Sequence, residues 1–493
     1  MAKRAHRALH GPVFGLGFLL VQAVAASAVE SPYVPGQIVV RLAPEASAQE
    51  FITQWDLTLT AQGADGALLC ASAEEDIPGL ANQMRQDAAV VHVEPNYRAE
   101  SPEAVRQMIL AAVGGTMAEF EDQGASHRIG LPTAHAVTRG AGVVVAVLDT
   151  GIDPGHAVWG DRVSPLAYDF VDSDNTPWEH ADGLDQDGDG EFDEGYGHGS
   201  MVAGIIALVA PEATLLPLRV LDSEGRSDVF TIARAIRYAV DSGADVVNMS
   251  FGVPGALVTL KAEIERGDAL GVVFIGAAGN EDRPAPTYTP ADLTSVIMVT
   301  ALDESDTKAE FADYHTKVAI AAPGVGIRSA YPGHEWGLGS GCSFATAFVT
   351  GETALLRSLH PDWNRSMIES RIAVTATPID DLPGNQGYAG RLGEGRIDVG
   401  GAITNASDVP ASGSAFPTGI TVVPNPSRAQ VRFRLGVGLS ASAMEIFDPQ
   451  GRRVAVLRGK DGQFAWDPHP ALPSGSYFAR IAGGPSIRFE RVR

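Results

Sequence analysis

Short apolar runs without polar alternation recur through the middle of the chain, and they predict buried strands. The runs span residues 142–148, 245–249, 271–275 and 295–299. Apolar positions at helical spacing cover residues 230–242 and 343–359. Strands that are apolar on both faces are typical of a parallel sheet with helices on either side. We therefore expect an α/β unit at residues 129–405, with its chemistry at the carboxyl ends of the strands.

The pattern is different before this unit. Residues 29–100 contain short strand-like and helical runs, at 37–42, 77–86 and 89–93. These runs predict a small separate α+β unit. The segment 101–128 is polar and only weakly helical, which is typical of a connector open to cleavage.

The pattern changes again after the α/β unit. Pro, Ser, Gly and Ala dominate residues 406–418, which indicates a linker. Beyond it apolar and polar positions alternate with period two, as in the run from Val431 to Val437. This alternation predicts a small β-sandwich at residues 419–493.

The first residues have the features of a targeting segment. Lys3, Arg4 and Arg7 precede an apolar stretch, and Ala26-Ser27-Ala28 supplies small residues for cleavage. This pattern predicts a secretory signal peptide at 1–28; a single membrane anchor is the alternative, but the stretch is short for a span. We therefore expect a protein that is secreted or held at the cell surface.

Composition narrows the choice of partners. Of the 493 residues 45% are apolar and 19% charged, as in a globular protein, and the formal net charge is −24. A nucleic acid is not expected as a partner, because binding to its phosphates requires a basic face and the chain has no cluster of Lys and Arg after residue 28. The chain has two cysteines, Cys70 and Cys342, which fall in different predicted units, so we expect no structural disulfide.

Asp149 and His198 are the first candidates for chemistry. Asp149 ends the apolar run 142–148, where a buried carboxylate requires a partner and can orient a histidine. His198 follows in Gly197-His198-Gly199, where a loop leads into an apolar helix. Taken singly, the aspartate can also be a cap and the histidine a structural residue.

Ser343 and Asn280 occupy comparable positions. Ser343 begins the helical run 343–359, where free backbone N–H groups can stabilise an oxyanion, although an N-cap serine would look the same. Asn280 follows the run 271–275, and its amide can donate to the same oxyanion or serve a turn. The coincidence of these residues in one α/β unit favours the catalytic interpretation.

An acidic loop precedes His198. It alternates carboxylates with glycines, and the candidate ligands are Asp185, Asp187, Asp189, Asp193 and Glu194. Such spacing can surround one hard cation, so we expect a structural calcium ion, with a solvated acidic loop as the alternative. The helix-loop-helix calcium motif is not complete, because Tyr196 stands at the twelfth position from Asp185.

Short motifs around these residues resemble the signatures of the subtilisin family of serine proteases. The motifs are Asp149-Thr150-Gly151, His198-Gly199 and Gly341-Cys342-Ser343. The resemblance covers residues 129–403 and implies a subtilisin-like, mostly parallel sheet with helices on both faces. It also implies a serine endopeptidase that acts on polypeptides without a catalytic cofactor.

The family mechanism assigns a role to each candidate. Ser343 would attack the peptide carbonyl, His198 would transfer the proton, Asp149 would orient the imidazole, and Asn280 would donate to the oxyanion. The resemblance also implies backbone walls for an extended peptide, at Ser250, Phe251, Gly252, Ala277, Ala278 and Gly279.

The chain departs from the family pattern around the nucleophile. Cys342, Phe344 and Ala347 stand where Thr, Met and Pro are usual. None of these changes removes a catalytic group. Phe344 is bulkier than the usual Met, so we expect it to affect the rate of catalysis and the substrate preference more than the type of reaction. Cys342 resembles the cysteine of thiol-sensitive relatives, and it can equally be a small core residue.

The flanking units carry weaker resemblances. Residues 29–97 resemble the family's inhibitory propeptide, which implies that the chain's own N-terminal unit is a partner of the site. Residues 419–493 are similar to C-terminal sorting or FlgD-like β-domains, which implies contact with secretion or cell-surface machinery.

The main alternative for the whole protein is a catalytically inactive surface binding protein on a subtilisin scaffold. A second alternative, a carboxyl serine peptidase, is contradicted by His198 and Asn280, because that type has Glu and Asp at these positions.

Overall fold

The computed structural model describes residues 31–105, 111–185, 190–255, 257–284 and 288–404, and beyond them Leu472 and the strands between 420 and 491. The predicted leader at 1–28 and the linker at 406–418 lie outside the described residues. Among the helices in these ranges, none combines the length and the apolarity of a bilayer span.

The described chain begins with an antiparallel sheet packed against helices. Its elements are β1 (Tyr33–Leu42), α1 (Ala48–Gln54), β2 (Thr58–Gln62), β3 (Leu68–Ala71), α2 (Ile77–Met84) and β4 (Val90–Glu100). The strands lie in the order β2-β3-β1-β4, and β9 (Arg226–Asp228) pairs antiparallel with β4. The predicted strand and helix runs are confirmed here. However, β4 continues to Glu100 instead of ending at residue 93, because its last residues find a partner strand in β9.

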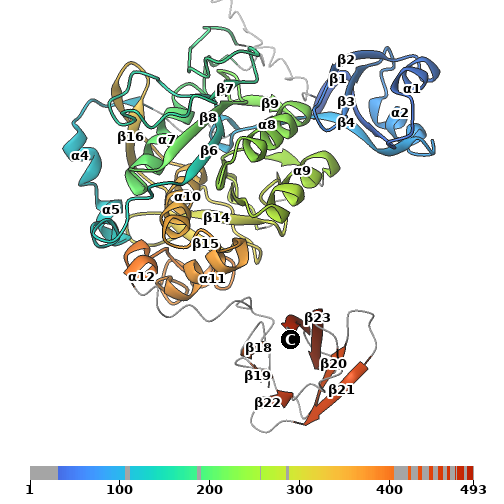
Figure 1. The fold of residues 1–493 in the computed structure, drawn as a ribbon. Coiled ribbons are helices and arrows are strands. Elements are labelled where there is room, and N and C mark those ends of the chain that lie inside the picture. Colours follow the sequence, from blue (N-terminus) through green and yellow to red (C-terminus); the bar gives the residue numbers. More distant parts are fainter. Residues whose placement is uncertain are drawn as a thin grey trace, which may run out of the picture. The chain divides into compact units, whose positions relative to one another are not determined.

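Within the described residues, the central sheet has seven parallel strands in the order β15-β14-β12-β10-β6-β8-β7. Figure 1 labels β6, β7, β8, β14 and β15 of this sheet. They are β6 (Val144–Asp149), β7 (Tyr168–Asp169), β8 (Thr214–Arg219), β10 (Val246–Met249), β12 (Val273–Ala277), β14 (Val296–Leu302) and β15 (Ile320–Pro323). The four apolar runs predicted as buried strands form β6, β10, β12 and β14, which confirms the predicted α/β sheet.

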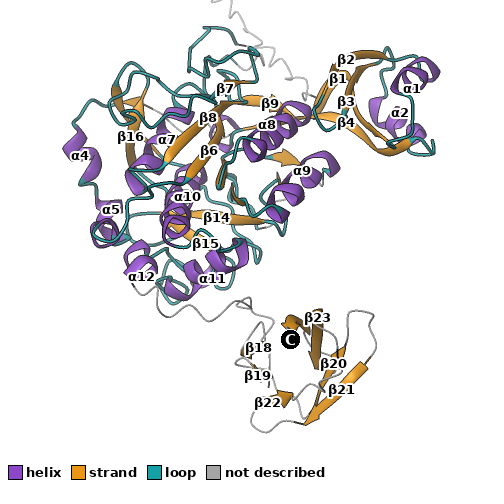
Figure 2. Ribbon diagram, viewed as in Figure 1, coloured by secondary structure: helices purple, strands orange, loops and turns teal. Residues whose placement is uncertain are grey.

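Helices cover both faces of this sheet, as Figure 2 shows in purple around the orange strands. The longer ones are α7 (His198–Val209), α8 (Val229–Asp241), α9 (Val258–Ala269), α10 (Cys342–Leu359) and α11 (Arg365–Thr375). Alternate residues of β6 enter different cores: Val145 and Val147 pack with α7 and α10, whereas Ala146 and Leu148 pack with α8 and α9. This double burial explains why the strand runs lack polar alternation.

Shorter elements surround the sheet. They are α3 (Pro102–Val105), β5 (Ala111–Ala112), α4 (Met117–Glu121), α5 (Gly124–Arg128), α6 (Leu131–His135), β11 (Val253–Pro254), β13 (Tyr288–Thr289), β16 (Ile327–Tyr331), β17 (Glu335–Gly339), the 3-10 helix η1 (Gln386–Tyr388) and α12 (Val399–Thr404). The helices α3, α4 and α5 fall in the predicted connector, so its polar sequence forms separate short helices.

Strands also form in the C-terminal part, where period-two alternation predicted them. They are β18 (Ile420–Val423), β19 (Val431–Leu435), β20 (Ala443–Phe447), β21 (Arg453–Arg458), β22 (Gln463–Trp466), β23 (Gly475–Ile481) and β24 (Ser486–Arg491). They make antiparallel sheets in the orders β18-β19-β22 and β21-β20-β23-β24. Phe433 and Trp466 of one sheet share a core with Ile446 and Tyr477 of the other, as in a sandwich.

The helix α10 contains a buried acid that no hydrogen bond satisfies. Glu352 is 0% exposed, and neither carboxyl oxygen has a hydrogen-bond partner among the described residues. Burial, reinforced by the charge of Asp398 and opposed by that of Arg371, raises the pKa of Glu352 to about 8. An acid in such surroundings is more stable in its neutral form.

We therefore predict that Glu352 makes the protein lose stability as pH rises. The folded pKa lies above the unfolded value, so the stabilisation is complete below the unfolded pKa and is lost as pH rises through about 8. Between the unfolded and the folded pKa, the free energy of unfolding falls by about 1.4 kcal/mol for each pH unit, because the folded protein keeps one proton that the unfolded chain releases. Glu352→Gln should therefore gain stability relative to its parent between pH 5 and 8, measured by urea unfolding with Ser343→Ala as parent. Exposed Glu310→Gln is the control, and parallel curves for all three chains would contradict the assignment.

Candidate active site

A buried histidine and a buried aspartate meet at the end of β6. Asp149 is the last residue of β6, and His198 is the first residue of α7. The distance from His198 Nδ1 to Asp149 Oδ1 is 2.6 Å, and the two residues are 0% and 1% exposed. The Thr150 backbone N–H also donates to Asp149 Oδ1, at 2.8 Å. The carboxylate is thereby fixed in an orientation that holds the imidazole.

Glycines allow these two elements to approach each other. Gly151 has φ +104, and a Cβ there would lie 2.6 Å from the Pro177 carbonyl oxygen. Gly197 has φ +93, and its Cβ would lie 2.3 Å from the Tyr331 ring. Side chains at either position would clash, so both glycines are required for the geometry.

Ser343 and Asn280 converge on the same point through a residue that the sequence did not indicate. The Ser343 hydroxyl donates to Glu103 Oε2 at 2.7 Å, and the distance from His198 Nε2 to the same oxygen is 3.0 Å. The Asn280 amide donates to Glu103 Oε1 at 3.0 Å. The serine and the histidine therefore meet through one shared carboxylate oxygen, and Glu103 is only 2% exposed.

The charges of this cluster are mutually dependent. Burial opposes a charge on His198, but the carboxylates of Asp149 and Glu103 outweigh it and raise the pKa of His198 well above its usual value. Burial would raise the pKa of Glu103, yet the facing imidazole and three hydrogen bonds lower it. The surroundings of His198 thus favour the protonated imidazole between the two carboxylates.

The predicted peptide walls lie beside this cluster. The backbone of Gly252 exchanges two hydrogen bonds with Glu100, at 2.9 and 3.1 Å, and the Ser101 N–H donates to the Gly225 carbonyl at 2.9 Å. Chain residues 100–101 therefore lie between two backbone edges, as an extended peptide would. Of the neighbouring wall residues, Ser250 accepts from Asn248 at 2.9 Å, and Phe251 is buried in the α8–α9 core.

The second wall follows β12. Ala277 ends the strand, and the Ala278 N–H donates to the Val299 carbonyl at 2.9 Å. The Gly279 carbonyl accepts from the Asp313 N–H at 3.0 Å and from the Cys342 thiol at 3.0 Å. Hydrogen bonds to Val299, Asp313 and Cys342 therefore fix the backbone of Ala278 and Gly279.

The cysteine before Ser343 belongs to the core. Cys342 is 0% exposed, and burial raises its thiol pKa to about 12. Cys70 is also a buried free thiol. These surroundings favour the interpretation of Cys342 as a small core residue, because a reactive cysteine requires an accessible thiolate.

The acidic loop is only partly described. Asp187 and Asp189 lie outside the described residues. The Asp193 carboxylate accepts backbone N–H groups of Asp182 and Gly183, and Asp185 Oδ2 accepts the Gly190 N–H at 3.1 Å. Within the described part of the chain, no three acidic, histidine or cysteine side chains are grouped as metal ligands. The described carboxylates, Glu194 included, thus form no calcium cage by themselves.

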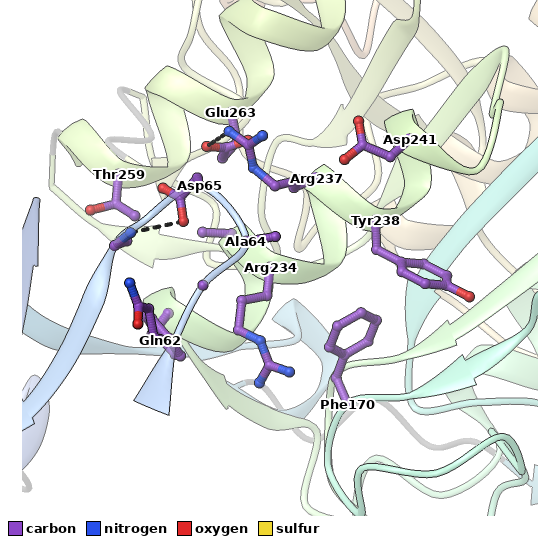
Figure 3. A pocket seen from close by; sticks show the side chains of 14 residues that line it. Gln62, Ala64, Asp65, Phe170, Arg234, Arg237, Tyr238, Asp241, Thr259 and Glu263 are labelled. Atoms are coloured by element: carbon purple, nitrogen blue, oxygen red, sulfur yellow. Dashed lines mark hydrogen bonds and ion pairs between the residues drawn. The ribbon is translucent and has the colours of Figure 1, made fainter. Parts of the chain in front are cut away.

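A cavity of about 520 Å³ lies elsewhere, between the β2–β3 turn and the helices α8 and α9 (Figure 3). Arg237 points toward Glu263 there, at 2.8 Å, and Asp65 caps its own turn through the Ala67 N–H. None of the predicted catalytic residues lines this cavity. The cavity thus lies where the N-terminal antiparallel sheet contacts α8 and α9.

Glu179 is a second residue that the sequence did not indicate. Its carboxylate accepts the backbone N–H groups of Gly197, Gly199 and Ser200, at 3.1–3.2 Å, and the hydroxyls of Thr150 and Ser200. Because Gly197 has no side chain to cap α7, Glu179 supplies the cap from a distant loop. It thereby joins the end of β6 to the helix that begins with His198.

Comparisons with known proteins give a consistent picture. The subtilase family profile matches residues 140–395, just over half of the chain, and a profile called open reading frame 2 N-terminal domain matches residues 21–98. Subtilisin E of Bacillus subtilis (strain 168) is 35% identical over 53% of this chain and 65% of its own length. Thermitase of Thermoactinomyces vulgaris is 33% identical over 56% of this chain and 94% of its own. The chain thus spans slightly less than two thirds of subtilisin E.

Two solved structures are also similar. Fervidolysin from Fervidobacterium pennivorans has a TM-score of 0.63 at 20% identity, over 91% of this chain and 71% of its own, which is a likeness of fold. A protease from Pseudoalteromonas arctica PAMC 21717 has a TM-score of 0.52 at 28% identity, over 58% of this chain and 98% of its own.

The contacts of Glu179 predict that it stabilises the start of α7. In Glu179→Gln, an amide N–H₂ would face the backbone donors that one carboxylate oxygen now accepts, and a buried donor without an acceptor costs about 1–3 kcal/mol. We expect a lower melting temperature, measured by circular dichroism. Asp161→Asn makes the same acid-to-amide change at an exposed position and should melt with the wild type. Equal melting of all three chains would show that the cap is dispensable.

Proposed function

The chain belongs to the subtilase family, and on this premise we propose that it is a secreted serine endopeptidase that hydrolyses peptide bonds through an acyl-enzyme intermediate. One observation carries the proposal: a hydroxyl, an imidazole and an amide N–H all converge on one anionic carboxylate. Peptide hydrolysis requires these same groups: the hydroxyl attacks the carbonyl carbon, the imidazole accepts its proton, and the amide N–H donates to the developing oxyanion.

The chemistry follows from these positions. With a peptide carbonyl in place of Glu103, the Ser343 oxygen would attack the carbon while His198 Nε2 accepts its proton. Asp149 would keep the proton on Nδ1, so that Nε2 is free to act as the base. The Asn280 amide would donate to the oxyanion, and one such donor is typically worth about 3 kcal/mol. His198 would then return the proton to the leaving amine.

The N-terminal unit, residues 29–100, is proposed as an inhibitory propeptide. Its contacts with the α8–α9 side support this role: β4 pairs with β9, and Glu94 accepts the N–H groups of Val258 and Thr259 at the start of α9. Phe230 packs with Val39 and Leu69 in a shared apolar cluster. The unit would leave when the connector is cut. The leader would direct export, and residues 419–493 would serve sorting or surface attachment.

A catalytically inactive binding protein is the alternative, and the blocked site gives it a specific basis. A fluorophosphonate probe separates the two, because it reacts with an activated serine. We expect the exported, processed chain to be labelled and to hydrolyse unfolded casein, and Ser343→Ala to lose both reactions. A processed wild-type chain that neither reacts nor hydrolyses would contradict the peptidase.

The same variant tests maturation. If the chain cuts its own connector, Ser343→Ala should accumulate as the uncut precursor, which intact mass would detect. A Ser343→Ala chain that matures normally would assign the cut to another protease.

We also propose that the acidic loop binds calcium and braces the segment before His198. The support is the concentration of carboxylates, which repel each other without a cation. Removal of calcium with EGTA should lower the melting temperature, and added calcium should restore it. Asp187→Asn with Asp189→Asn should melt at the same temperature with and without the chelator. An unchanged wild-type midpoint would leave the loop as a solvated segment.

A further inference from the structure

The connector enters the site in an unusual way. Residues 100–101 lie between the first predicted peptide wall, where Glu100 pairs with Gly252, and the Gly225 carbonyl, which accepts from Ser101. The chain then turns into the helix α3 at Pro102, whose fixed φ suits the first helical position. The turn presents the Glu103 side chain to Ser343. An acid side chain thus occupies the position in which a substrate would present a peptide carbonyl.

The fit of this side chain is tight. A Cβ on Gly341 would lie 1.8 Å from Glu103 Oε1, so the residue before Cys342 leaves room for the carboxylate only as glycine. Glu103 Oε2 accepts from Ser343 and contacts His198, while Oε1 accepts from Asn280. The Ser343 hydroxyl, the His198 imidazole and the Asn280 amide are therefore all engaged by one buried residue.

These contacts also change the state of the nucleophile. The Ser343 hydroxyl donates its hydrogen bond to Glu103, and the imidazole lies between the carboxylates of Asp149 and Glu103, which raise its pKa and favour its protonated form. A protonated imidazole has no free electron pair to accept the serine proton. In this state the site is obstructed, and its base is also disabled.

We propose that Glu103 is a carboxylate latch: in the uncut chain its side chain occupies the oxyanion position and separates Ser343 from His198, so that the connector blocks the site without offering it a peptide bond. This inference rests on the proposed function and specifies how the site is regulated. Self-cleavage then requires α3 to leave the site first, and the stability of the latch sets the rate of activation.

The test compares uncut chains that differ in one residue. Glu103→Gln keeps the shape of the side chain but loses its charge. Its amide N–H₂ is a donor that would face the Ser343 hydroxyl, the His198 imidazole or the Asn280 amide, which are donors themselves. Glu121→Gln is the matched control, because Glu121 is an exposed acid of the same connector. The readout is the rate at which a fluorophosphonate labels Ser343 in the uncut chain, with a melting curve to verify folding. The processed wild-type chain is labelled in parallel.

We expect uncut Glu103→Gln to be labelled at least about tenfold faster than the uncut wild type, since it loses hydrogen bonds to a charged group. Glu121→Gln should match the wild type. Faster self-cleavage of Glu103→Gln, followed by intact mass from the start of expression, would support the latch equally. The latch would be overturned if the uncut wild type and a folded, uncut Glu103→Gln were labelled equally slowly while the processed chain was labelled fast. The proposed peptidase activity would still stand in that case. Failure of the processed chain to react would overturn the proposed function itself.

Discussion

The contact of one imidazole with two buried carboxylates is the interaction on which this site depends. Asp149, His198 and Glu103 are each nearly inaccessible to solvent, and an isolated charge in such surroundings would be very unfavourable. The two carboxylates favour the charged imidazole, and the imidazole favours the charged form of Glu103. Glu103 is one of the two carboxylates that raise the pKa of His198, so its departure would lower that pKa and favour the neutral imidazole that can act as a base.

The parallel sheet explains why the candidate residues could be predicted. Asp149 ends β6 and Asn280 follows β12, two strands of the sheet with β10 between them, while His198 and Ser343 lie in the first turns of helices that pack on one face of that sheet. Unbroken apolar runs indicate such strands, and their carboxyl ends meet at one edge. Local pattern and topology together were therefore sufficient to propose these four residues as one site.

Glu103 and Glu179 could not be predicted in this way. Glu103 lies in a helix of only four residues within a polar connector, and its partners are 95 to 240 positions away in the sequence. Glu179 lies in a loop and caps a helix whose own start lacks a capping side chain. Neither residue has a periodic pattern around it. Their roles arise from tertiary contacts alone: Glu179 accepts backbone N–H groups that the start of α7 leaves open, and Glu103 contacts side chains from three distant segments.

Inhibition and catalysis in this arrangement draw on the same donors. The Asn280 amide, which is suited to an oxyanion, and the Ser343 hydroxyl, which would be the nucleophile, both donate to the Glu103 carboxylate. A change in either donor would therefore weaken the closed state and the reaction together. Glu103 differs from them, because the connector supplies it and the reaction does not use it. Variation at this position can adjust the strength of inhibition while leaving the reactive groups intact, which makes the connector the part of the chain where activation can change independently of catalysis.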